Sequence, residues 1–185
     1  MQIQLSHVAL LVPSTQKATE HLRQFNFQIG PDEFWEGEGT KEVYIEREKG
    51  NSLLLMEPFK DGAYKRALEK RGPGIHHLAI DVTNIETYIE SLAQSGWLLH
   101  PRSLKTIKQV KTAYLARPGF PALIEVQENK TLEEKPLFVN LIELPFDSSL
   151  EKLLLPIGCE NVVKKNEGEL LITLFQQKIK FSNLL

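Results

Sequence analysis

The chain has 185 residues, 42% of them hydrophobic, which is enough to bury a sizeable core in one domain or in one domain with an appendage. Its 22 basic and 24 acidic side chains show no basic excess, so we expect no nucleic-acid partner. A single cysteine, Cys159, excludes an intrachain disulfide. No apolar run reaches the ~20 residues of a membrane span, and the N-terminus lacks the features of a signal peptide. We therefore expect a soluble, cytoplasmic protein.

The first 60 residues predict a strand, a helix and three further strands. The first strand ends before Pro13, and Ser14 is a residue type that commonly caps the N-terminus of a helix. A glycine-rich turn at 36–39 separates the second strand from the third. The expected elements are a strand at 1–11, a helix at 14–25, a second strand before the 36–39 turn, strands at 42–46 and 52–57, and a linker at 58–71 whose residues 63–70 have helical composition.

The same order of elements returns 70 residues later. The sequence His77-Leu78-Ala79-Ile80 echoes His7-Val8-Ala9-Leu10, and Asn84 opens a helical pattern to Ser95 just as Ser14 does in the first copy. Further matched pairs are Phe27 with Trp97, Tyr44 with Tyr114, and 52–57 with 121–126. Two copies of one βαβββ module are therefore predicted, at about 1–60 and 72–128.

This order of elements, with these residues, resembles the vicinal oxygen chelate (glyoxalase/dioxygenase) superfamily. The segment 69–82 is similar to the central segment of methylmalonyl-CoA epimerases, and the segments 55–58 and 123–126 fit the same pattern. The resemblance covers roughly residues 3–128. It implies an α+β fold in which paired βαβββ modules form a curled mixed-sheet cup that holds a divalent metal. We expect this two-module domain to span residues 1–130.

The candidate metal ligands are His7 and His77, at equivalent points of two pseudo-symmetric strands, and Glu125, on the last strand of the second module. Imidazole and carboxylate together suit a borderline divalent ion such as Zn²⁺, Co²⁺, Ni²⁺, Mn²⁺ or Fe²⁺. The family usually supplies a fourth ligand, Glu or Gln, from the last strand of the first module, where this chain has Leu54 or Leu55. Three protein ligands would leave open positions for water or substrate.

The resemblance implies a metal-dependent isomerase or lyase that moves the α-proton of a thioester through a metal-stabilised enolate. Such epimerisation needs bases on opposite faces of the carbon. Glu125 can fill one role, and the other aligns near Gly37, which makes Glu38 or Glu36 the candidate. The expected partner is a small molecule such as an acyl-CoA or a glyoxalase-type hemithioacetal.

Two alternatives remain open at this point. The His-His-Glu set also matches the facial triad of non-haem Fe(II) oxygenases, which favours a dioxygenase. Loss of the fourth ligand favours a non-catalytic protein that binds small molecules in the same cup. Three lysines placed around the sixth and seventh strands could meet the phosphates of coenzyme A, although lysines are also common on solvated edge strands. They are Lys105, Lys108 and Lys111.

Residues 131–185 form a C-terminal extension outside the resemblance. Strands are expected at 137–144, 161–165, 169–175 and 178–182, with a short helix from Asp147 or Ser148 to Leu155. The order is again βαβββ-like, which suggests a degenerate third half-module with Val139 in place of the ligand histidine. A third module has no partner within the chain, so this interpretation would pair it with its copy in a homodimer. The alternative is a helix and hairpin that cover an exposed sheet edge.

Overall fold

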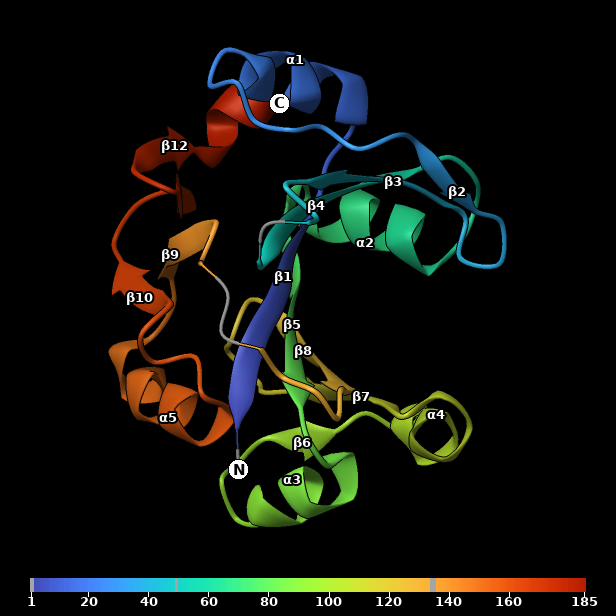
Figure 1. The fold of residues 1–185 in the computed structure, drawn as a ribbon, viewed down its shortest axis with the longest axis vertical. Helices are drawn as coiled ribbons and strands as arrows, with labels where there is room; N and C mark the ends of the chain where they lie inside the picture. Colours follow the sequence, from blue (N-terminus) through green and yellow to red (C-terminus); the bar gives the residue numbers. More distant parts are fainter. Residues whose placement is uncertain (1, 49, 134–135) are drawn as a thin grey trace.

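The computed structural model describes residues 2–48, 50–133 and 136–185 (Figure 1). Two modules join into one eight-stranded mixed sheet with the order β2-β3-β4-β1-β5-β8-β7-β6. The elements of the two modules are β1 (Ile3–Leu11), α1 (Thr15–Arg23), β2 (Glu33–Trp35), β3 (Thr40–Ile45), β4 (Ser52–Pro58), α2 (Ala63–Arg71), β5 (Gly74–Val82), α3 (Ile85–Ser91), β6 (Leu98–Leu99), α4 (Ser103–Val110), β7 (Thr112–Ala116) and β8 (Leu123–Glu128).

The predicted repeat of βαβββ modules is confirmed by the strand pairing. In each module the first strand pairs in parallel with the last, β1 with β4 and β5 with β8. The first strands of the two modules then pair antiparallel, so that β1 and β5 form the central spine of the sheet. This arrangement relates the modules by a pseudo-two-fold axis near the spine. It brings residues that are 70 apart in sequence to equivalent places on adjacent strands.

Helices α1 and α3 begin where the sequence predicts and end earlier, whereas α2 extends one residue beyond its predicted end. The Ser14 hydroxyl accepts a hydrogen bond from the Lys17 backbone N–H, and Asn84 caps α3 in the same way through Thr87. The second module also contains a helix that was not predicted, α4. Lys105 and Lys108 lie on this helix, between β6 and β7, and not on an edge strand.

Alternation along the spine separates two apolar clusters, because successive strand side chains point to opposite faces. On one face, Ala9, Leu11, Leu54 and Met56 form a small cluster that α2 covers with Ala67 and Leu68. The other face carries the main core, where Val8, Leu10, Leu53 and Leu78 are buried against the extension. Figure 1 shows α2 and α4 on one side of the spine and the extension on the other.

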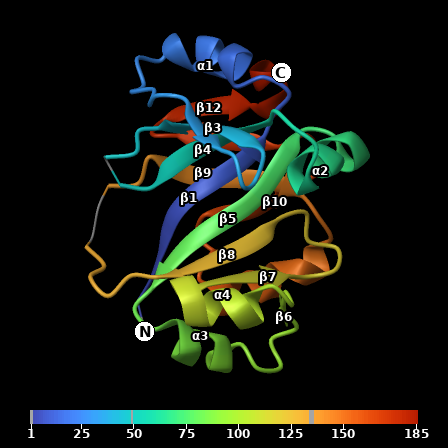
Figure 2. The same cartoon turned by 90° about the vertical axis from the view of Figure 1, so that its right-hand side faces the viewer.

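The extension forms a separate four-stranded sheet with the order β10-β9-β11-β12, which Figure 2 shows behind the eight-stranded sheet. It covers a sheet face, not the sheet edge that the alternative interpretation placed there. Its first strand pairs in parallel with the next strand, β10, whereas a module pairs its first strand with its last. The interpretation of the extension as a degenerate half-module that pairs in a homodimer therefore stays a prediction. The strand order of the extension differs from that of the two modules. The elements are β9 (Val139–Pro145), the 3₁₀ helix η1 (Ser148–Leu153), α5 (Leu154–Ile157), β10 (Val163–Asn166), β11 (Leu171–Leu174), β12 (Gln177–Lys180) and the 3₁₀ helix η2 (Phe181–Leu184).

Within the three described ranges, no helix has the length and apolar character needed to cross a bilayer.

Candidate metal centre

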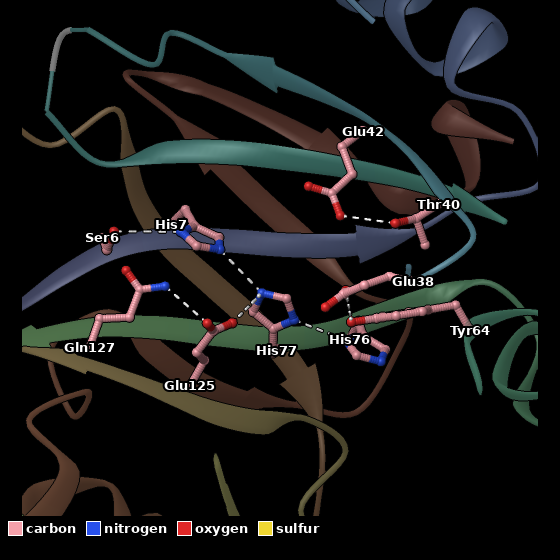
Figure 3. A network of polar contacts seen from close by, with 10 residues as sticks. All are labelled: Ser6, His7, Glu38, Thr40, Glu42, Tyr64, His76, His77, Glu125 and Gln127. Carbon is pink, nitrogen blue, oxygen red and sulfur yellow. Dashed lines mark hydrogen bonds and ion pairs between the residues drawn. The ribbon is translucent and has the colours of Figure 1, made fainter. Parts of the chain in front are cut away.

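Three side chains from neighbouring strands converge at the centre of the cup (Figure 3). His7 on β1, His77 on β5 and Glu125 on β8 each offer one ligand atom, and these atoms all lie within 4.8 Å of one another. The two Nε2 atoms are 3.1 Å apart, and His77 Nε2 lies 3.3 Å from Glu125 Oε2. The structure thus brings together all three residues that the sequence analysis named as ligands.

Two β-bulges aim the histidines into the cup. The β1–β5 register skips a residue at Ser6 and another at His76, so each candidate ligand directly follows a bulged residue. The bulged residues also contact the far side of the rings. Ser6 Oγ lies 3.5 Å from His7 Nδ1, and His76 Nδ1 lies 2.9 Å from His77 Nδ1. Such outer contacts hold a ring orientation and leave Nε2 free to face a metal.

The bulge also corrects one expectation about His76. Simple alternation places this residue on the opposite face of β5 from His77. The extra residue in the strand instead leaves the His76 ring beside that of His77, and 4.9 Å from the ring of Tyr64 on α2. His76 is therefore an outer-sphere residue of the site.

Burial keeps both candidate histidines neutral at physiological pH. Desolvation, assisted by the charge of Arg47, lowers the pKa of His7 to about 4, and desolvation holds the pKa of His77 well below its usual value. Burial raises the pKa of Glu125, whose Oε1 accepts a hydrogen bond of 2.9 Å from the Gln127 amide. Two neutral imidazoles and one carboxylate, all desolvated, fit a borderline divalent cation, which would offset the cost of burying the carboxylate.

Strand register decides which leucine replaces the fourth ligand. Leu54 pairs with Ala9 across β1 and β4, just as Glu125 pairs with Ala79 across β5 and β8. Leu54 therefore holds the place in the first module that Glu125 holds in the second, and it lines the cup. Leu55 belongs to the main core on the other face.

The two acids of the 36–39 turn have different surroundings. Glu38 lines the cup and accepts a hydrogen bond of 2.8 Å from the Tyr64 hydroxyl. Glu36 points away, with a side chain 76% exposed and ion-paired to Lys60. The structure thus brings Glu38 to the site and leaves Glu36 outside it.

The sequence analysis missed a buried carboxylate, Glu42, on β3. It lines the same cavity of about 200 Å³ and is only 8% exposed. Burial raises its pKa to about 7, with the negative charges of Glu38, Glu33 and Glu125 adding to the rise and a hydrogen bond from the Thr40 hydroxyl opposing it. A signal was present in the sequence: Glu42 stands two residues before Tyr44, so alternation puts both on one face.

The family model of the Glyoxalase/Bleomycin resistance protein/Dioxygenase superfamily matches residues 6–114, more than half of the chain. The chain therefore belongs to this superfamily. The comparison with curated proteins finds no match.

Among solved structures, a hypothetical protein from Bacillus halodurans C-125 is similar, with 24% identity, a TM-score of 0.59, and coverage of 73% of this chain and 100% of that one. Methylmalonyl-CoA epimerase from Mycobacterium tuberculosis has 21% identity and a TM-score of 0.53, covering 68% of this chain and 87% of its own. A Streptomyces coelicolor methylmalonyl-CoA epimerase variant in complex with 2-nitronate-propionyl-CoA has 20% identity and a TM-score of 0.53, with coverage of 71% and 97%. At these identities the likeness establishes the fold.

Proposed function

We propose that this protein is a metal-dependent isomerase or lyase that transfers a proton at a carbon next to a carbonyl, as an epimerase of a small acyl thioester would. The observation that carries the proposal is the convergence of His7, His77 and Glu125 in a cup that also contains Glu42. Two structures of the same fold are methylmalonyl-CoA epimerases, one of them with a bound propionyl-CoA derivative. These neighbours favour an acyl-CoA over other carbonyl substrates.

His7, His77 and Glu125 would hold the divalent ion, with Zn²⁺, Co²⁺, Ni²⁺, Mn²⁺ and Fe²⁺ all compatible with the donor set. When bound, such an ion supplies a Lewis acid that stabilises negative charge on a substrate carbonyl oxygen. Leu54, which lines the cup, offers no donor atom. The three candidate ligands would thus leave coordination positions open for water or substrate.

The carboxylates of the cup would move the proton. Glu42 approaches from β3 and Glu125 from β8, which lie on opposite sides of the β1–β5 spine in the sheet order. A base with a pKa of about 7 both accepts and returns a proton readily at neutral pH, so Glu42 suits the general-base role better than an ordinary surface acid. Glu38 remains the second candidate base, oriented by Tyr64.

The size of the cavity limits what enters it. Ligand pockets commonly span about 300–1,000 Å³, and this cup measures about 200 Å³. We infer that it accepts only a short acyl group and its thioester. A carrier as large as coenzyme A would lie outside, beginning at Trp35, which lines the cup and is 51% exposed.

The first test is the metal content of the purified protein and of His77→Ala, with His21→Ala as a matched control at a half-buried position of α1 that does not line the cup. We expect one metal equivalent per chain in the wild type and in His21→Ala, and its loss in His77→Ala. Metal-free wild-type protein, after incubation with each of the five ions, would overturn the metal centre.

The second test follows α-proton exchange with D₂O by NMR over a small panel of acyl-CoA thioesters. Glu42→Gln should slow exchange by about 10²–10⁴-fold, because general-base catalysis contributes on that order. Glu36→Gln is the control and should exchange at the wild-type rate, since its side chain points away from the cup. No exchange with any metal-loaded sample, or an equal loss in both variants, would contradict the assignment.

A second candidate function rests on Leu54. Its apolar side chain leaves a three-ligand His-His-Glu set, which is the composition of the facial triad in Fe(II) oxygenases. Oxygen uptake with catechols or 2-oxo acids in the iron-loaded protein would favour a dioxygenase. Tight binding of a small molecule that persists after metal removal would instead favour a non-catalytic binding protein.

A further inference from the structure

A second cavity, of about 500 Å³, lies at the end of the spine where β1 ends and β5 begins. None of the residues that line the metal cup lines this cavity. Leu11 and Gly74, which face each other across these two strands, line it. Phe120, from the turn between β7 and β8, forms a second wall. Leu144 and Phe181 of the extension form a third. The cavity is therefore completed only when the extension packs against both modules.

The walls of this cavity are strongly apolar. Leu11, Phe120, Leu144, Leu170 and Phe181 are each at most 9% exposed and belong to the two hydrophobic clusters. Its volume falls within the range of about 300–1,000 Å³ that is typical of small-molecule sites. These properties suit an apolar chain of moderate length and exclude a ligand that is polar throughout.

One charge marks the rim. Arg71, the last residue of α2, lines the cavity with an exposed guanidinium. Over the described ranges, no carboxylate forms an ion pair with it, whereas Lys60 and Lys65, near the N-terminal end of the same segment, both have acidic partners. An unpaired guanidinium beside an apolar cavity favours a ligand that combines an anionic head with an apolar body, because arginine binds carboxylates through paired, charge-assisted hydrogen bonds.

We propose that this cavity binds an amphipathic carboxylate, a medium-chain fatty acid in chemical class, with its head group on Arg71 and its chain between Phe120 and the extension. The site does not depend on the metal centre or on the proposed reaction. It also assigns a function to the extension, whose Leu144, Leu170 and Phe181 supply the wall that the two modules lack.

The test is calorimetric titration of the full-length protein with decanoate below its micelle concentration. Arg71→Gln should weaken binding by about tenfold or more, because a charged hydrogen-bonded contact is worth about 1.5–3 kcal/mol. Arg66→Gln is the matched control, an exposed arginine on the same helix that does not line the cavity, and should bind as the wild type does. Decanol, which keeps the chain and lacks the charge, should bind wild type and Arg71→Gln equally.

Methyl NMR of the same titrations locates the ligand. Shifts at Leu144 and Leu170 would place decanoate in the proposed cavity, whereas shifts confined to Leu54 would place it in the metal cup and overturn the proposal. Absence of saturable decanoate binding, or an equal loss of affinity in Arg66→Gln, would also overturn it. None of these outcomes bears on metal content or α-proton exchange, so this site and the proposed function fail separately.

Discussion

At the scale of single residues, Leu54 is the point at which the two modules differ chemically. Leu54 pairs with Ala9 on β1 in the same way that Glu125 pairs with Ala79 on β5, yet the Leu54 side chain has no donor atom. The candidate metal site is consequently one-sided: its three candidate donors come from β1, β5 and β8, and the β4 residue in the matching place contributes an apolar wall. Glu42 and Tyr44, also from the first module, line the cup beside Leu54.

Restoring a donor at position 54 should strengthen metal binding. We expect Leu54→Gln to raise the metal affinity by about tenfold, since a fourth ligand completes a tetrahedral set. Leu55→Gln is the matched control: its amide would enter the main core, so it should leave affinity unchanged and lower the free energy of unfolding by about 2–4 kcal/mol. Competition with a chelator and urea unfolding measure the two effects. Tighter metal binding in the Leu55 variant would show that the register assignment is wrong.

The raised pKa of Glu42 predicts how stability depends on pH in the metal-free protein. Its pKa is about 7 in the folded protein and 4.5 when unperturbed, so between these values the folded state binds more protons than the unfolded one. The contribution of Glu42 to stability should therefore fall as pH rises through this window, opposite in sign to the contributions of His7 and His77, whose pKa values are lowered. Glu42→Gln should remove the contribution of Glu42, so the stability of the variant relative to the wild type should rise with pH. Urea unfolding at pH 5 and pH 8 in the presence of EDTA tests this, with the exposed Glu36→Gln expected to retain the wild-type slope.

At the scale of elements, the two modules use matched devices at matched places. Ser14 and Asn84 each cap the helix that follows the first strand, and each accepts a backbone hydrogen bond from three residues ahead. The two bulges, at Ser6 and His76, likewise stand 70 residues apart and precede the candidate ligands. The capping residues were recognisable because their effect is local, whereas a bulge depends on how two distant strands pair.

The matched caps should contribute matched stabilities. Ser14→Ala and Asn84→Ala should each lower the free energy of unfolding by about 1 kcal/mol, because each leaves a backbone donor of the first turn without its partner. Asn161→Ala, at an exposed position in the extension, should change it by less than about 0.5 kcal/mol. Urea unfolding of the three variants measures this. A cap variant indistinguishable from the control would show that its helix does not depend on the cap.

At the scale of the whole molecule, one buried side chain ties the extension to the first module. The Asn51 carboxamide oxygen accepts hydrogen bonds from the backbone N–H groups of Phe138 and Val139, at 2.7 and 2.8 Å. Its amide donates to the Val139 carbonyl at 2.9 Å. Because Asn51 is fully buried, these three bonds fix where β9 begins relative to β4.

Removing these hydrogen bonds should destabilise the protein without changing its metal content. Asn51→Ala should lower the free energy of unfolding by about 2–4 kcal/mol. The substitution leaves buried backbone groups without hydrogen-bond partners, and each such group costs about 1–3 kcal/mol. Metal content should stay at the wild-type level, since none of the three candidate ligands contacts Asn51. Urea unfolding measures the loss of stability, and elemental analysis measures the metal content. Loss of metal in this variant would show that the extension shapes the cup.

The sequence by itself determined the features that depend on short-range pattern: the period of two in the strands, the capping residues, and the repeat that makes His7 and His77 equivalent. Those features predicted the two modules, and the family resemblance that they carry implied the cup and a candidate ligand set. Only the tertiary structure decided that Leu54 faces the cup, that Glu36 points outward, that Glu42 is buried and that His76 lies beside His77. Each of these depends on register, on a bulge or on the surrounding packing, which strands distant in sequence set together and which no local pattern encodes.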